Sequence, residues 1–196
     1  MSTNSFDFLR IDMRARRTRA LLADALLELS VKHDIDAIEI ADLIKAAGVG
    51  RSTFYTHYSG KDDFRIASFV NLIVMAERAM AAKYPEREDI IPSQPLFKHV
   101  FEAGDFARNV AKSDVFPRQM AAAEEQLRII AEANLARRMP AWSLERRRET
   151  AIFVAAGFIG LLRWWMTRGL KQSAEDMQRA FFRLSTSALA EPSERP

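Results

Sequence analysis

The chain has 196 residues, 48% of them hydrophobic and 28% charged, which is typical of a folded protein with one large domain or two small ones. It has no cysteine and three histidines, which excludes disulfides, thiolate metal sites and thiol nucleophiles. Glycine and proline number seven each, well below their usual share, so turns are few and long helices are favoured. The polar residues 1–5 do not resemble a signal peptide, and the longest apolar run (151–162) is too short to span a bilayer. We therefore expect a cytoplasmic protein.

The N-terminal third predicts helices separated by glycines. The expected ranges are about 12–33, 37–46, 51–58 and 62–84. In the first of them, apolar residues recur at the spacing of one helical face: Leu22, Ala25, Leu26 and Leu29. Asp36 and Glu39 have the spacing of a capping box for the second helix. Gly48 and Gly50 separate the second helix from the third.

The rest of the chain predicts further helices after a loop that contains three prolines. The expected ranges are about 95–112, 117–138, 144–168 and 173–189. Gly104 interrupts the first of these, and Ser173 is placed to cap the last. The predicted fold is therefore all-α, with about nine helices. It divides into a three-helix, helix-turn-helix domain at 10–62 and a C-terminal helical bundle domain at 63–190.

Two short helices joined by a tight turn, within residues 38–61, carry the strongest functional signal. Gly48 lies where the turn needs a positive φ, which glycine adopts at little cost. A small core that holds the two helices is expected from Leu43, Ala47, Val49 and Phe54. The helix at 51–58 then presents a polar and aromatic face that suits the major groove of DNA.

The string AAGVGRSTFYTHYSGKDDF at residues 46–64 closely resembles the TetR family of bacterial transcriptional regulators, and the resemblance extends over about 14–66. It implies that base edges are contacted by Arg51, Ser52, Tyr55 and Thr56. It implies that phosphates are held by Thr53, His57 and Lys61. The chain departs from the family pattern at Glu39, Ala41, Ile44 and Gly50. We expect Glu39 to serve its own helix cap with Asp36 rather than to face DNA.

Five arginines precede this motif against one acid, Asp12, and they oppose the dipole at a helix N-terminus. They are Arg10, Arg14, Arg16, Arg17 and Arg19. The alternative is a solvated helix start. Because the motif adjoins them, we expect Arg14, Arg16 and Arg17 to contact the phosphate backbone.

The segment 151–162 is apolar around its whole circumference, so we expect it to be covered on two sides. In TetR-like proteins the last two long helices form a dimer interface, and the resemblance implies a homodimer here. The candidate interface residues are Gly157, Gly160, Trp164, Met177, Phe181 and Leu184. The alternative is a central core helix in a monomer.

Aromatic and methionine side chains of the C-terminal domain are candidates for a ligand pocket, although the same pattern is typical of plain core. The candidates are Phe97, Phe101, Met120, Phe158 and Trp165. His99 and Glu102 lie three residues apart, but a solvated face explains them better than a metal site. Nucleotide-binding and nucleophile motifs are lacking, so we expect no metal, no cofactor and no enzyme activity.

The sequence and the resemblance together predict a DNA-binding regulator with no membrane partner. We expect a homodimeric repressor that leaves its palindromic operator when a small apolar or amphipathic ligand binds the C-terminal domain. The helix at 62–84 would couple the two domains. A helical enzyme or small-molecule carrier without DNA binding is the alternative, and an activator on the same fold is a second one.

Overall fold

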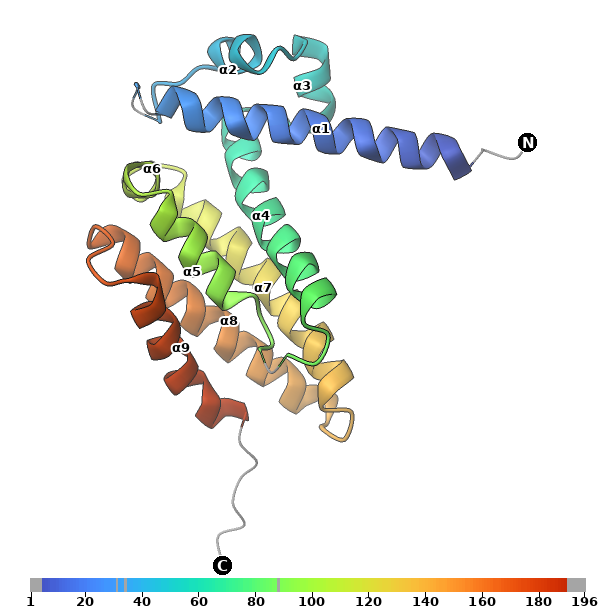
Figure 1. Ribbon diagram of the computed structural model, residues 1–196, viewed down its shortest axis with the longest axis vertical. Helices are drawn as coiled ribbons and strands as arrows, with labels where there is room; N and C mark the ends of the chain where they lie inside the picture. The colour runs from blue at the N-terminus through green and yellow to red at the C-terminus, as the bar shows by residue number, and fades with distance from the viewer. Residues whose placement is uncertain (1–4, 31, 34, 88, 190–196) are drawn as a thin grey trace, which may run out of the picture. The chain divides into compact units, whose positions relative to one another are not determined.

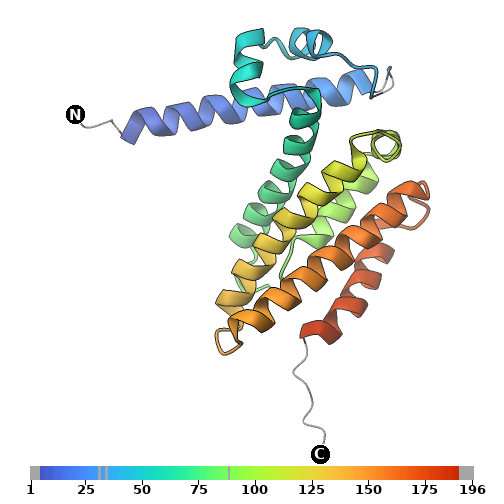
Figure 2. The same cartoon turned by 180° about the vertical axis from the view of Figure 1, so that it is seen from behind.

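The computed structural model describes residues 5–30, 32–33, 35–87 and 89–189, with helical backbone alone at 5–13 and 187–189. Within these ranges it has nine helices and no strand, which confirms the all-α class (Figures 1 and 2). The helices are α1 (Ser5–Ser30), α2 (Ile40–Ala47), α3 (Arg51–His57), α4 (Lys61–Lys83), α5 (Ser93–Glu102), α6 (Asp105–Val110), α7 (Phe116–Arg138), α8 (Leu144–Thr167) and α9 (Ala174–Leu189). The chain divides into two compact units, Met1–Ser68 and Phe69–Pro196.

The helices differ from the sequence expectation most clearly in three places. Helix α1 begins at Ser5 rather than near residue 12, because neither glycine nor proline interrupts this stretch. Helix α2 begins at Ile40 rather than near residue 37. The expected helix at 95–112 is two helices, because Gly104 has φ +52° and ψ −116°, which no residue of an α-helix adopts.

The first unit is built from α1, α2, α3 and the first two turns of α4 around a small apolar core. Leu22 from α1 and Leu43 from α2 are buried in it, with Phe54 from α3. Phe54, Tyr58 and Phe64 form an aromatic cluster whose ring centroids lie 5.0–6.0 Å apart. This core fixes α3 by its apolar side and leaves the other side of α3 to solvent.

Gly48 ends α2 with φ +62° and ψ +29°, as the turn between the two helices was predicted to require. The Gly48 N–H donates to the Lys45 carbonyl at 3.3 Å and the Val49 N–H donates to the Ile44 carbonyl at 3.0 Å, which closes the last turn of α2. A Cβ at this position would meet no heavy atom within 4 Å, so any substitution cost comes from the backbone conformation alone.

We expect Gly48→Ala to lower the free energy of unfolding by about 1–2 kcal/mol, the cost of a left-handed L-residue. Gly48→Asn is the matched control, because asparagine tolerates this conformation and its destabilisation should be clearly smaller. Urea unfolding of both variants measures the difference. Equal destabilisation would show that Gly48 is not held in the left-handed region.

The second unit is a bundle in which α7 and α8 lie side by side, with α5 and α9 against them (Figures 1 and 2). Its centre is aromatic: Phe97, Phe158, Trp165 and Phe181 are all buried, with ring centroids 4.8–6.4 Å apart. Helix α8 is capped by Ser143, whose Oγ accepts a hydrogen bond from the Arg146 N–H at 3.1 Å.

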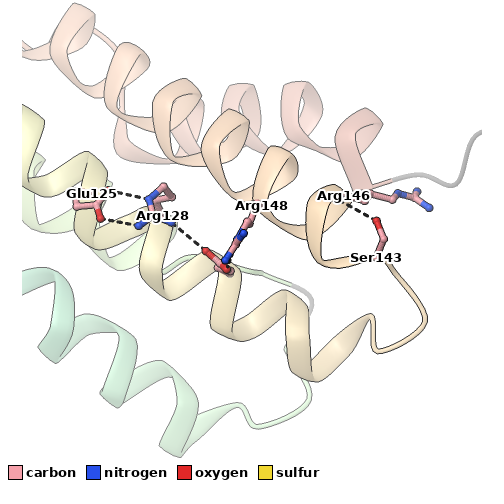
Figure 3. A network of polar contacts seen from close by, with 6 residues as sticks. Glu125, Arg128, Ser143, Arg146 and Arg148 are labelled. Carbon is pink, nitrogen blue, oxygen red and sulfur yellow. Dashed lines mark hydrogen bonds and ion pairs between the residues drawn. The ribbon is translucent and has the colours of Figure 1, made fainter.

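A surface network of ion pairs joins α7 to α8 (Figure 3). Arg128 bridges Glu125 and Glu132 on α7, with N–O distances of 2.6 and 3.0 Å. Arg148 of α8 reaches Glu132 at 3.3 Å. Because these side chains are half-exposed or exposed, the network adds little to stability.

From its sequence, the twelve-residue apolar run at 151–162 was too short to span a bilayer. Over an 18-residue window, however, helix α8 has the length and composition of a membrane-spanning helix. Half of that window is buried inside the protein. Val154, Phe158 and Leu162 lie in the core of the second unit, as in the central helix of a soluble bundle.

Candidate DNA-binding surface

The turn at Gly48 and the core beneath it determine which side of α3 is free. Phe54 is 0% exposed and anchors α3 among the aromatic side chains of the first unit. The Gly50 N-cap is extended, and Tyr58 ends α3 in an extended conformation. The five other side chains of α3 before His57 are therefore exposed: Arg51, Ser52, Thr53, Tyr55 and Thr56.

Arg51 and Tyr55 lie next to each other at the outer face of α3. The Arg51 guanidinium carbon is 5.7 Å from the Tyr55 ring centroid, and the ring itself is 45% exposed. Thr56 Oγ1 donates to the Ser52 carbonyl at 2.9 Å, so its hydroxyl is engaged by its own helix. A guanidinium beside an aromatic hydroxyl, on a helix that stands clear of its own core, can contact base edges and phosphates.

Lys61 is half-buried at the start of α4, where the sequence predicted a phosphate contact. Its Nζ donates to the Asp36 carbonyl at 2.7 Å and lies 3.6 Å from the Glu39 carboxylate. A DNA phosphate would therefore compete with Glu39 for this charge. Lys61 remains a candidate, but a weaker one than the exposed residues of α3.

The predicted capping box is wrong. Glu39 is the N-cap residue of α2, but its side chain makes no cap hydrogen bond. The Asp36 carboxylate instead accepts from Arg65 of α4 at 2.8 Å. Sequence reasoning missed Arg65, whose side chain is only 2% exposed in the structure. The sequence feature that could have indicated it is an arginine directly after the core residue Phe64.

The arginines of α1 form the second part of the candidate surface. Arg14, Arg16 and Arg17 are exposed, whereas the side chain of Arg10 lies outside the described residues. Arg19 lies near Tyr58: burial raises the pKa of the Tyr58 hydroxyl, and the positive charge of Arg19 partly opposes this shift. Arg19 is thus a further cation of this unit.

We expect replacement of Arg14, Arg16 and Arg17 by alanine to weaken binding to all DNA sequences alike. The slope of log affinity against log salt should shrink by about 0.9 for each phosphate that is no longer neutralised. Lys112→Ala, an exposed cation of the second unit, is the control. A titration between low and moderate salt measures the slope, and an unchanged slope would remove these arginines from the surface.

The sequence profile of the bacterial regulatory proteins of the tetR family matches residues 22–67, which contain the turn and the whole of α3. This helix-turn-helix part of the chain is therefore similar to the TetR family of bacterial regulators, and the matched residues end before the second unit. Over 55 residues it is 40% identical to the uncharacterized HTH-type transcriptional regulator YxbF of Bacillus subtilis (strain 168). This match covers 28% of the chain and only 14% of that relative.

Solved structures show the same fold over nearly the whole chain. The fatty acid degradation regulator FadR from Bacillus halodurans is 15% identical, with a TM-score of 0.58, and the match covers 89% of this chain and 97% of that one. A putative TetR-family transcriptional regulator from Syntrophomonas wolfei str. Goettingen is also 15% identical, with a TM-score of 0.60 and coverage of 92% and 99%. The second unit of this chain therefore shares their fold.

The candidate dimer residues fall into two groups. Trp164 and Leu184 are 41% and 52% exposed, Gly157 is exposed and Gly160 is half-exposed. Met177 and Phe181 are 2% and 6% exposed and lie in the core of their own chain. The expectation that these two contact a partner is corrected, because the apolar stripe of α9 that carries them faces inward.

Four of the five candidate pocket residues are fully buried core: Phe97, Met120, Phe158 and Trp165. Their three rings pack directly on one another, and their predicted role in lining a ligand pocket stays a prediction. Phe101 differs, because its ring is 45% exposed and stacks on Trp165 at 6.1 Å with an interplanar angle of 3°.

His99 and Glu102 lie on the outer side of α5. Glu102 pairs with Lys98 at 3.7 Å rather than with a metal-binding neighbour. Desolvation lowers the pKa of His99, and the nearby charge of Glu102 partly opposes this shift. Within the part of the chain that the structure describes, no group of three or more histidine, cysteine or acidic side chains comes together.

Proposed function

We propose that this protein is a cytoplasmic transcriptional regulator of the TetR type that reads a palindromic operator as a homodimer, inserting α3 of each copy into the major groove. The observation that carries this proposal is the exposed side of α3, with Arg51 beside Tyr55 and Phe54 anchored behind them. Two recognition helices about 34–36 Å apart, one turn of DNA, are needed to read both half-sites together.

The proposed homodimer is supported by the outward faces of α8 and α9. Phe153 and Trp164 on α8 are 55% and 41% exposed, and Gly157 and Gly160 lie between them at helical spacing. Phe182 and Leu184 on the neighbouring α9 are each more than half exposed. Apolar side chains on two adjacent helices suit a second copy of the same surface.

We favour repression as the mode of action, with a small apolar or amphipathic ligand releasing the protein from its operator. Phe101 offers the ligand a surface position that leads to the buried indole of Trp165. The ligand would have to separate the packed aromatic side chains, and α4, continuous from Lys61 to Lys83, would carry the change towards α3. A ligand lowers operator affinity only as far as it prefers the shape that does not bind DNA.

We expect such a ligand to lower operator affinity by about 5–150-fold, and operator DNA to lower ligand affinity by the same factor. Medium-chain carboxylic acids and aromatic amphiphiles are the compounds to screen, with tryptophan fluorescence as the binding signal. Phe101→Ala should weaken ligand binding without changing operator affinity in the absence of ligand. A bound compound that leaves operator affinity unchanged would contradict ligand control.

The function itself is tested by titrating the full-length protein with duplex fragments from upstream of its own coding sequence. We expect one fragment to bind at least about 1,000-fold more tightly than a scrambled duplex, which is within the usual range for specific binding. The complex should contain two chains. Equal binding to all fragments would contradict a sequence-reading regulator.

A further inference from the structure

A buried polar cluster in the second unit joins α4, the loop that follows it and α7. It consists of Glu77 on α4, Arg87 between α4 and α5, and Asn134 on α7, and we call it the clasp. The Glu77 Oε1 atom accepts from both Arg87 and the Asn134 amide, the latter at 3.0 Å. The side chains of Arg87 and Glu77 are only 4% and 17% exposed.

Both the nitrogen and the oxygen of the Asn134 side-chain amide form hydrogen bonds, and these bonds determine its orientation. Its nitrogen donates to Glu77 and to the Ile90 carbonyl, both at 3.0 Å. Its oxygen accepts from Arg137 at 3.2 Å. One side chain of α7 therefore binds α4 and the segment before α5 at the same time. Small displacements of either segment would break a directional bond.

The contacts that α4 makes with the core of this unit are apolar and less specific. Ile73 is fully buried in the core, and Phe69, Leu72 and Ala76 pack against it partly buried. Apolar residues at i, i+3, i+4 and i+7 present a similar surface after a shift of one turn. Burying an ion pair adds little net stability compared with apolar side chains of similar volume. The directional bonds of the clasp therefore fix the position of α4 more than they raise the free energy of unfolding.

We propose that the clasp fixes the register of α4 against α7 and thereby holds the protein in the form that binds DNA. The second half of this proposal rests on the proposed function. The first half does not, because it concerns only residues of the second unit. Helix α4 is unbroken from Lys61 to Lys83, so the helix that carries Glu77 also carries Lys61, a candidate phosphate contact.

The test replaces the clasp by apolar side chains of similar size, Glu77→Leu, Arg87→Met and Asn134→Leu together. The matched control is Arg128→Met with Arg148→Met, which removes the exposed network of Figure 3. Because the chain has no cysteine, spin labels can be placed at Arg78→Cys and Ala136→Cys, exposed positions on α4 and α7. Pulsed electron resonance then measures the distance between the labels.

We expect the clasp variant to keep its helical content and its Tm, while the label distance broadens or shifts by up to about 5 Å, one helical turn. Its affinity for the operator should fall at least tenfold. The control should keep a narrow distance and full affinity. An unchanged distance in the clasp variant would overturn the proposal, whatever its affinity for DNA.

A second variant keeps the test decisive if the triple replacement does not fold. Asn134→Leu alone leaves the ion pair of Glu77 and Arg87 in place and removes only the bonds from α7. The same broadening is expected, and a narrow, unchanged distance would overturn the clasp. If the parent protein binds no DNA sequence specifically, the proposed function fails while the distance measurement still decides the register.

Discussion

The Gly160→Arg variant should be a monomer and should bind the operator at least about 100-fold more weakly than the parent, because it loses the gain from joining two binding modules. Gly160 lies on the outward side of α8 between Gly157 and Trp164. An added Cβ meets no heavy atom of its own chain within 4 Å, so the arginine can be accommodated in the monomer. In the proposed interface it would bury an unpaired charge.

Gly160→Ala is the matched control, since it adds a Cβ without charge and should remain a dimer. Size-exclusion chromatography with light scattering gives the mass, and fluorescence anisotropy gives operator affinity. Phe181→Glu is unsuitable as an interface probe, because Phe181 packs on Phe158 at 5.4 Å in the core. A monomeric parent, or a dimeric Gly160→Arg variant with full operator affinity, would contradict the proposed interface.

The Arg51→Ala variant should lose base preference at one position of each half-site. If Arg51 contacts guanine, removing it costs about 1–3 kcal/mol at each half-site. A symmetric dimer uses Arg51 twice, so operator affinity should fall by about two to four orders of magnitude, while binding to random DNA falls much less.

Tyr55→Phe is the comparison for Arg51, because it keeps the ring beneath the guanidinium and removes only the hydroxyl. It should reduce affinity by about 1 kcal/mol, as expected for one hydrogen bond. Competition titrations with operators changed at single positions measure the preference. Full base preference in Arg51→Ala would mean that α3 is not the recognition helix.

Much of the candidate surface could be predicted from sequence because its determinants are local. The left-handed turn needs glycine at position 48, and the core position of Phe54 fixes which side chains of α3 are exposed. The predicted capping box failed because the partners of Asp36 are distant. Lys61 and Arg65 lie 25 and 29 residues further along the chain, and local spacing does not reveal them.

The C-terminal unit was harder to predict because one pattern serves two roles. An apolar stripe at helical spacing describes a core face and an interface face equally well. Met177 and Phe181 therefore matched the pattern of an interface but pack inside their own chain. The aromatic side chains predicted to line a pocket form packed core for the same reason. The clasp has no local pattern, since Glu77 and Asn134 are 57 residues apart.

Selection of bound sequences from a pool of random duplex DNA tests the central claim most directly. The parent protein should enrich a palindrome whose half-sites are centred about one helical turn, or a multiple of it, apart. Arg51→Ala should relax one symmetric pair of positions within it. Enrichment of no sequence, or of the same sequence by parent and Arg51→Ala alike, would contradict a regulator that reads DNA through α3.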